Sequence, residues 1–270
     1  MKILFFGDIV GRVGRSGVKK ILPELKEKYQ PDIVIANGEN LAHGVGITPK
    51  TVQEMIDAGI DIFTSGNHIW DKPNGEEILQ DSDTKVIRPL NYGDSKSGVG
   101  FKELDVKGEK LLLINLQGEV YIKDDLDNPF NSLDKFLAGH PPKDYDAIFI
   151  DFHAEATSEK VAMGWHADGR ASAVVGTHTH IPTADARILP KGTAYITDVG
   201  MAGLRDGVIG VEREGILKRF LSTSELLEEG GGGFFSYSDE GECDISALII
   251  EIGEQRKAKS IELLQYTVET

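Results

Sequence analysis

The chain has 270 residues, enough for one large domain, or two small ones, with a sizeable core. Its 44 acidic residues outnumber its 29 lysines and arginines, and the formal net charge of -15 disfavours non-specific binding to nucleic acid or another polyanion. The single cysteine, Cys243, excludes an internal disulfide and a thiolate cluster, so a metal site would have nitrogen and oxygen ligands. We expect Cys243 itself to be a small buried or loop residue.

No apolar run in the sequence approaches the roughly 18 residues that a membrane-spanning helix needs. The N-terminal stretch MKILFFGDIVGR has a short apolar run, and it lacks the long apolar region and the cleavage site of a signal peptide. It is better explained as a first buried strand. We therefore expect a cytoplasmic protein with no membrane partner and a single domain over residues 1–270.

Short β-rich apolar runs recur along the chain, and each ends in Gly, Asn, Asp, Glu or His. They are KILFFGD (2–8), DIVIANGEN (32–40), IDIFTSGNH (60–68), YDAIFIDFHAE (145–155) and ASAVVGTHTH (171–180). A helix ending in ILPELKEKY is expected after the first run, and another begins near Thr48, with Pro49 in its first turn. Such continuous apolar runs indicate strands that are buried on both faces, as in layered α/β proteins.

Other segments predict antiparallel hairpins. One joins VGFKELDV to LLLINLQ through KGEK, and the other joins DISALIIEI to AKSIELLQYTVE through GEQR. Together with the buried runs they predict an α/β protein with mixed sheets covered by helices. The Gly-rich segment 229–243 is expected to be a flexible surface loop, with a functional lid as the alternative.

Residues that can bind a metal or donate a proton follow the apolar runs, at the strand ends where α/β sheets collect ligands. In chain order they are Asp8, Glu39, Asn40, Asn67, His68, His153, His178 and His180. In an extended strand, residues i and i+2 point to the same side, so His178 and His180 could face one point. Five strand-like runs end with residues that can bind a metal, while none ends in lysine or arginine, and this coincidence predicts a metal site.

Each of these residues alone also has an ordinary structural explanation. The alternatives are a helix or turn cap for Asp8, solvated loop positions for Glu39 and Asn40, a left-handed turn for Asn67, and surface or hydrogen-bonded side chains for the histidines. The remaining histidines are weaker candidates. His43, in the AHGVG loop, could reach a substrate, although a plain loop role explains it more simply, and His140 and His166 are expected to be structural.

The motifs taken together resemble a known series. GD at 7–8, GNH at 66–68, the isolated His153 and THTH at 177–180 resemble the motifs of the calcineurin-like metallophosphoesterases. Through GDIVGRVGR, NGEN, GNHIWD, DFHAEATSEK and GTHTHIPTAD the chain is most similar to the YmdB-like branch, over most of its length. Two departures from the superfamily pattern argue against a generic protein phosphatase: Val10 stands where a D-x-H motif has histidine, and Glu39 stands where an aspartate usually bridges the metals.

The resemblance implies a four-layer α/β/β/α sandwich with mixed sheets and a site with two metal ions. One ion would be bound by Asp8, Glu39, Asn40 and His180, and the other by Glu39, Asn67, His153 and His178. His68 would stay unligated beside them as a proton donor. The family implies iron, while manganese or zinc could occupy the same ligands, because oxygen and imidazole ligands do not discriminate among these ions.

Such a site can hydrolyse a phosphate ester. Two ions about 3.5–4 Å apart share a bridging hydroxide that attacks phosphorus, and His68 could protonate the leaving oxygen. The resemblance favours a small phosphodiester substrate, in particular 2',3'-cyclic AMP or a related cyclic nucleotide. Arg205 or Arg213 could contact the phosphate and Trp70 could stack on a base, although surface and core roles explain each of them more simply.

Two other functions stay open. A phosphomonoesterase or general phosphatase would use the same chemistry, whereas a non-catalytic regulator would use metals only to hold a nucleotide. The presence of His68 argues against the regulator, because binding alone requires no proton donor. The resemblance also suggests a regulatory role in bacterial physiology through catalysis, and a homo-oligomer is plausible.

Overall fold

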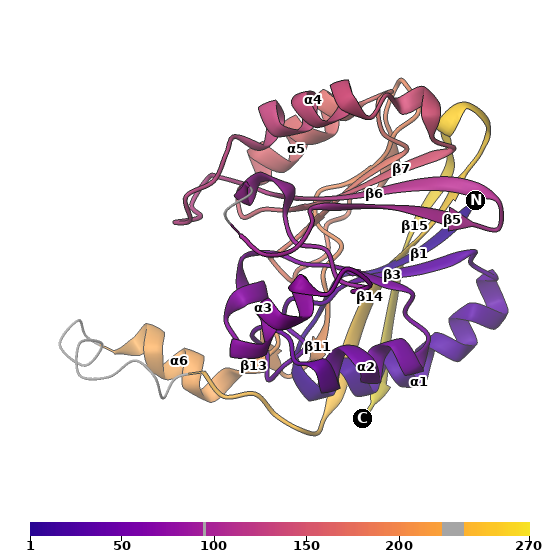
Figure 1. Cartoon of the computed structure of the whole chain (residues 1–270). Helices are drawn as coiled ribbons and strands as arrows, with labels where there is room; N and C mark the ends of the chain where they lie inside the picture. The colour runs from indigo at the N-terminus through magenta and orange to yellow at the C-terminus, as the bar shows by residue number, and fades with distance from the viewer. Residues whose placement is uncertain (94–95, 223–234) are drawn as a thin grey trace.

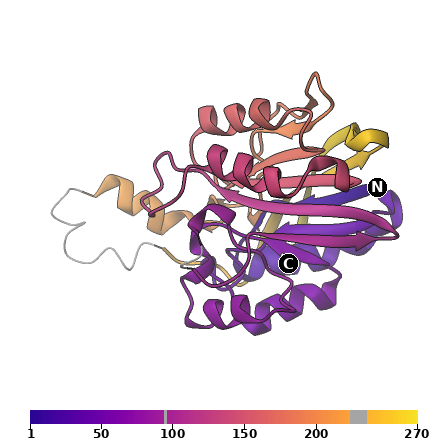
Figure 2. The ribbon, with the colours of Figure 1, turned by 45° about the horizontal axis from the view of Figure 1, so that its top comes forward.

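The structure is a computed structural model that describes residues 1–93, 96–222 and 235–270 (Figure 1). In this part of the chain, two large β-sheets lie face to face, and helices cover the outer face of each (Figures 1 and 2). The resulting α/β/β/α order of layers confirms the expected fold class. Residues 229–234 of the Gly-rich segment lie outside the described residues, so a surface loop or lid there stays a prediction.

The first sheet is mixed. Its strands are β1 (Lys2–Phe6), β2 (Asp8–Ile9), β3 (Ile33–Asn37), β4 (Ile62–Thr64), β11 (Met201–Leu204), β14 (Glu242–Ile252) and β15 (Ala258–Glu269). Their order is β2-β11-β14-β1-β3-β4, and β15 pairs with the other edge of β14. β1, β3 and β4 run parallel to one another, whereas β14 runs antiparallel to β1, β11 and β15.

The second sheet is also mixed, in the order β5-β6-β7-β8-β10-β9. Its strands are β5 (Phe101–Val106), β6 (Glu109–Gln117), β7 (Ala147–His153), β8 (Ala173–Thr177), β9 (Arg187–Ile188) and β10 (Ala194–Ile196). β6, β7, β8 and β10 are parallel. Both predicted hairpins are present, as β5 with β6 and β14 with β15, and a small ribbon joins β12 (Gly207–Val208) to β13 (Val211–Glu212).

Helices cover both sheets. On the first sheet lie α1 (Gly11–Tyr29), α2 (Pro49–Ala58) and α3 (Pro73–Gln80), and on the second lie α4 (Pro129–Gly139) and α5 (Thr157–Ala167). α6 (Arg213–Leu221) extends away from the layers (Figure 1). Short 3₁₀ helices are η1 (Asn67–Trp70), η2 (Leu90–Tyr92), η3 (Pro142–Asp144) and η5 (Glu254–Arg256). α2 begins as expected, because the Thr48 side chain accepts a hydrogen bond from Thr51 N.

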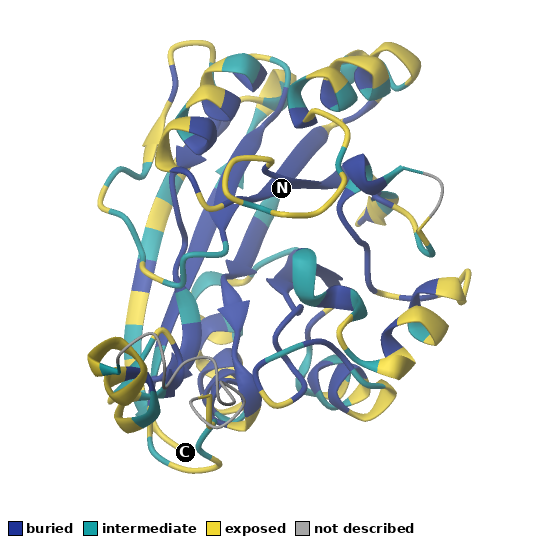
Figure 3. Ribbon diagram, turned by 90° about the vertical axis from the view of Figure 1, so that its left-hand side faces the viewer, coloured by how far each residue is buried: buried dark blue, intermediate teal, exposed yellow. Residues whose placement is uncertain are grey.

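The central strands are buried on both faces, as their apolar sequences predict (Figure 3). In β1, Leu4 packs in the core beneath α1 and α2, and Phe5 packs in the core between the sheets. In β7, Phe149 faces the core between the sheets, while Ile150 faces α4 and α5. Cys243 is buried in β14 as expected.

No helix in the described ranges is long and apolar enough to cross a membrane. The cytoplasmic location and the single domain over residues 1–270 stay predictions.

Candidate metal centre

The residues expected to form a metal site lie together, where parallel strands of both sheets end. From the first sheet come Asp8 at the start of β2, Glu39 and Asn40 after β3, and Asn67 and His68 in η1 after β4. From the second sheet come His153 at the end of β7 and, just after β8, His178 and His180. Residues far apart in the sequence meet here because the two sheets pack face to face.

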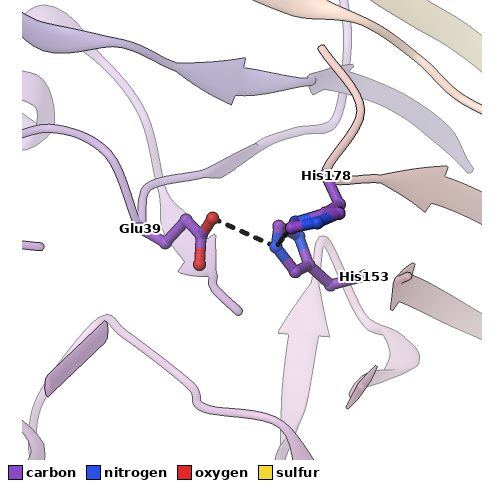
Figure 4. Close-up of side chains that lie close together, drawn as sticks. All are labelled: Glu39, His153 and His178. Carbon is purple, nitrogen blue, oxygen red and sulfur yellow. Dashed lines mark hydrogen bonds and ion pairs between the residues drawn. The ribbon is translucent and has the colours of Figure 1, made fainter. Parts of the chain in front are cut away.

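Glu39, His153 and His178 form a compact group (Figure 4). Their candidate ligand atoms all lie within 4.8 Å of one another. His153 Nε2 is 3.0 Å from Glu39 Oε1 and 3.0 Å from His178 Nδ1. A Cβ at Gly66 would lie 2.1 Å from His153 Cδ2 and 2.5 Å from Glu39 Oε2, so glycine leaves the space between these side chains open.

His180, Asn40 and Asp8 form a second group beside the first. His180 Nε2 lies 3.3 Å from Asn40 Nδ2 and 3.7 Å from Asp8 Oδ1. Asn40 Nδ2 is also 3.3 Å from Glu39 Oε1. Glu39 therefore lies between the two groups, where one carboxylate can serve both.

Within the described residues, two buried oxygens of the site have no hydrogen-bond partner: Asp8 Oδ1 and Asn67 Oδ1. Leaving a buried acceptor unsatisfied costs about 1–3 kcal/mol. A bound cation would satisfy both oxygens, since carboxylate and amide groups bind cations through oxygen. Asn40 instead turns its Nδ2 toward Glu39, so its amide must rotate before its oxygen could bind a metal.

The structure corrects the expected geometry of His178 and His180. β8 ends at Thr177, and His178 (φ 101°) and His180 (φ 67°) lie in an irregular turn rather than in a strand. The two histidines are brought into the site by this turn and not by the alternation of an extended strand. Positive φ at residues other than glycine is uncommon and costs about 1–3 kcal/mol, so the surrounding structure must hold the turn.

A buried ion pair between Lys160 and Asp198 holds the turn that carries His178 and His180. Asp198 Oδ2 accepts hydrogen bonds from Thr179 N (3.2 Å) and Thr179 Oγ1 (2.8 Å), and it pairs with Lys160 Nζ of α5. Both charged side chains are only 1% exposed. Lys160 and Asp198 thus fix the residue between the two histidines.

Hydrogen bonds also set the orientation of each imidazole. Thr177 Oγ1 donates to Asp151 Oδ1 (2.7 Å), so it accepts from His153 Nδ1 (2.9 Å) and leaves His153 Nε2 facing Glu39. The carbonyl oxygen of Ile209 can only accept, so it takes the proton of His180 Nδ1 (2.8 Å) and leaves Nε2 facing Asp8. Such outer partners fix the tautomer of metal-binding histidines.

His178 faces the site through Nδ1, whereas His153 and His180 face it through Nε2. Its Nε2 pairs with Glu155 Oε2 (3.1 Å), which leaves Nδ1 facing His153. His153 and His180 therefore present Nε2 to Glu39 and Asp8, respectively, while His178 presents Nδ1 to His153.

Burial and charge shift the pKa values of these residues in opposite directions. Burial opposes a charged His153, but Glu39 outweighs this effect and raises the pKa of His153 to about 9. Burial likewise opposes a charged Glu39, yet His153 holds the pKa of Glu39 well below its usual range. Burial raises the pKa of Asp8, and burial together with the charge of His153 lowers the pKa of His178 to about 3. His153 and Glu39 form a charged pair, and a cation bound between them would replace its proton.

His68 is held apart from this group. Its Nδ1 lies 2.7 Å from Asp71 Oδ2, and its side chain is 39% exposed. Its backbone N–H donates to Glu39 Oε2 (2.9 Å), which keeps the residue beside the site. The imidazole therefore borders the candidate metal group without joining it.

A cavity of about 640 Å³ opens over the site. Glu39, Asn40, His68, His178 and His180 lie among its lining residues. Val10, at the position of the missing superfamily histidine, is 3% exposed and also lines the cavity. A Cβ at Gly210 would lie 2.8 Å from Val10 Cγ1, so the β12–β13 turn packs directly on this valine.

The other residues singled out in the sequence lie elsewhere. Among the residues that the structure describes, Arg205 pairs with Glu242 and Asp244, Arg213 pairs with Glu214, and neither arginine lines the cavity. Trp70 packs edge-on against Tyr92, with ring centroids 4.6 Å apart. His166 pairs with Asp134, His140 stacks on Phe136, and His43 is exposed.

Sequence reasoning missed the residues that support the site. Asp151 was detectable as an acid inside the apolar run IFIDF, and Asp198 as an acid directly after the β10 run. Thr177 and Lys160 carry no such signal, because threonine is common in strands and a helical lysine normally faces solvent.

Comparison with known proteins identifies the family of this chain. A family model described as YmdB-like protein matches residues 4–264. The chain belongs to the YmdB-like family. This YmdB-like chain is 48% identical over 263 residues to a 2',3'-cyclic-nucleotide 2'-phosphodiesterase of Bacillus subtilis, with 97% of this chain and 96% of that protein covered.

Two solved structures from Thermus thermophilus are also similar to this chain. A hypothetical protein from Thermus thermophilus is similar to this YmdB-like chain at a TM-score of 0.90 and 39% identity, with 100% of both chains covered. A 5'-nucleotidase precursor from Thermus thermophilus shares the fold at a TM-score of 0.58 and 11% identity, over 100% of this chain and 54% of that one. The expected family, fold and enzyme class, a metallophosphoesterase, are confirmed.

Proposed function

We propose that this single-domain YmdB-like chain is a dinuclear metal-dependent phosphodiesterase that hydrolyses 2',3'-cyclic AMP or a related small cyclic nucleotide. The observation that carries the proposal is the convergence of carboxylate, amide and imidazole groups from both sheets around the space beside Gly66. The name of the Bacillus subtilis relative supports the substrate class.

The donor set fits two metal ions. Asp8, Glu39, Asn40 and His180 would hold one, and Glu39, Asn67, His153 and His178 would hold the other. The unsatisfied oxygens of Asp8 and Asn67, and the imidazole nitrogens turned toward Glu39 and Asp8, are the donors that such ions bind. We expect iron, with manganese or zinc as substitutes.

When bound, the two ions would supply positive charge that holds the phosphate and activates water as the nucleophile. The protein's own residues orient the ligands and handle the proton of the leaving group. Asp71 Oδ2 lies 2.7 Å from His68 Nδ1 and orients the ring, so Nε2 would be the atom that carries a proton to the leaving oxygen. His68 lines the cavity, where that oxygen would lie.

The first experiment measures metal content by elemental analysis on protein purified without chelator, together with hydrolysis of 2',3'-cyclic AMP by the same sample. We expect about two ions per chain and turnover. Folded protein that holds no metal, and stays inactive after iron or manganese is added, would contradict the proposal. Comparing bis-p-nitrophenyl phosphate with p-nitrophenyl phosphate separates a diesterase from a monoesterase, and nucleotide binding without turnover would indicate a regulator.

A further inference from the structure

The cavity over the site has two chemically different parts. Its floor carries the polar groups described above, which suit a phosphate. Its wall is apolar and consists of Val10, Val45, Ile209, Val211, Phe235 and Tyr237. Phosphoester chemistry alone does not require such a wall, and the volume of about 640 Å³ lies within the range of about 300–1,000 Å³ that holds a whole small organic ligand.

The backbone supports Tyr237, one of the two aromatic residues of the wall. Tyr237 packs directly on Gly44, since a Cβ there would lie 1.9 Å from Tyr237 Cε1. The neighbouring Ser236 carbonyl accepts a hydrogen bond from Glu212 N (2.9 Å), which ties the segment to β13. Phe235 nevertheless leaves 47% of its surface exposed. Tyr237 is thus held in place by the backbone, while Phe235 keeps exposed surface beside it, so both rings can contact a ligand in the cavity.

Two residues of the apolar wall, Ile209 and Tyr237, contact segments that carry candidate metal ligands. Ile209, 46% exposed, accepts the hydrogen bond of His180 Nδ1 through its carbonyl oxygen. Gly44 follows Glu39 and Asn40 in the same loop, so Tyr237 rests on the segment that carries two candidate ligands. A molecule whose phosphate reaches the floor would therefore place its remaining atoms against this wall.

Within the described residues, no lysine or arginine lines the cavity. The guanidinium of Arg219 lies 4.9 Å from the centre of the Phe235 ring but is not among the residues that line the cavity. The flat faces of a nucleobase suit the aromatic and aliphatic side chains of the wall. We propose that Tyr237 and Phe235, together with Ile209, bind the base of a cyclic mononucleotide while its single phosphate occupies the metal-binding floor. This inference rests on the proposed function for the position of the phosphate.

The test compares Tyr237→Leu, which keeps bulk against Gly44 but removes the aromatic ring, with Tyr237→Phe, which keeps the ring. Trp165→Leu is the matched control, because Trp165 is 51% exposed on α5 and lies outside the cavity lining. The measured quantity is the ratio of kcat/KM for 2',3'-cyclic AMP to kcat/KM for glycerol 1,2-cyclic phosphate, which has no base. Calorimetric binding of adenosine, which has no phosphate, is measured in parallel.

We expect Tyr237→Leu to lower the ratio about 10-fold to 100-fold and to weaken adenosine binding to a similar extent, while Tyr237→Phe and the control stay near the unsubstituted protein. An equal loss of kcat/KM on both cyclic phosphates, or adenosine binding that is unchanged in Tyr237→Leu, would contradict the proposed base-binding site. If neither cyclic phosphate is hydrolysed but adenosine still binds through Tyr237, the proposed function fails and the base-binding site stands.

Discussion

His68 has a different partner from the other histidines of the site. It pairs with the carboxylate of Asp71, whereas His153 and His180 point nitrogens toward Glu39 and Asp8. His178 points one nitrogen toward His153. We expect His68→Ala to lower kcat on 2',3'-cyclic AMP by about 10²–10⁴-fold, because the leaving oxygen loses its proton donor. Metal content, measured by elemental analysis, should stay near that of the unsubstituted protein.

His43→Ala is the control for this prediction. His43 is exposed in the loop after β3 and does not line the cavity in the described structure, so its loss should change neither turnover nor metal content. Loss of metal from His68→Ala would show instead that His68 is a ligand.

The chemical identity of the site residues could be predicted from the sequence, but their supports could not. Asp8 and His153 stand at the ends of apolar runs, where the α/β pattern places ligands. The positive φ of His178 depends on contacts with β10 and α5, which no local pattern encodes. Thr177 orients His153 only because β7 and β8 are neighbours.

At the scale of elements, the turn after β8 depends on the Lys160–Asp198 pair that joins α5 to the end of β10. Removing one partner of a buried pair leaves an uncompensated charge and costs about 3–5 kcal/mol. We expect Lys160→Met to lower the free energy of unfolding by about this amount, measured by urea denaturation. Lys160→Met/Asp198→Asn should recover part of the loss, because the double variant buries no unpaired charge.

An exposed ion pair gives the matched control. Lys259 Nζ lies 3.4 Å from Glu251 Oε1, and these side chains are 62% and 43% exposed. Because solvent screens such a pair, Lys259→Met should cost less than about 1 kcal/mol. If Lys160→Met costs no more than Lys259→Met, the buried pair does not stabilise the turn.

At the scale of the whole molecule, the sequence predicts which segments form strands and hairpins better than it predicts how the two sheets are ordered and packed together. Continuous apolar runs predict strands buried on both faces, and turn residues predict the two hairpins, because both signals are local. The position of β11 beside β14, and the facing of one sheet on the other, depend on contacts between distant segments. The ligand-capable residues at the strand ends therefore predict one metal site, but only the family resemblance implies that they come from two sheets packed face to face.

Metal binding should consequently stabilise the whole fold, because the proposed ligands join the two sheets. At a free metal concentration about 100 times the dissociation constant, one site contributes about 2.7 kcal/mol, which raises the unfolding temperature by roughly 5–10 °C. We expect this rise when manganese is added to chelator-treated protein, measured by calorimetry. Glu39→Ala should abolish most of the rise, since Glu39 lies between both groups. Glu251→Ala, which changes a solvent-exposed side chain of β14, should preserve it. An equal rise in all three proteins would mean that manganese binds elsewhere.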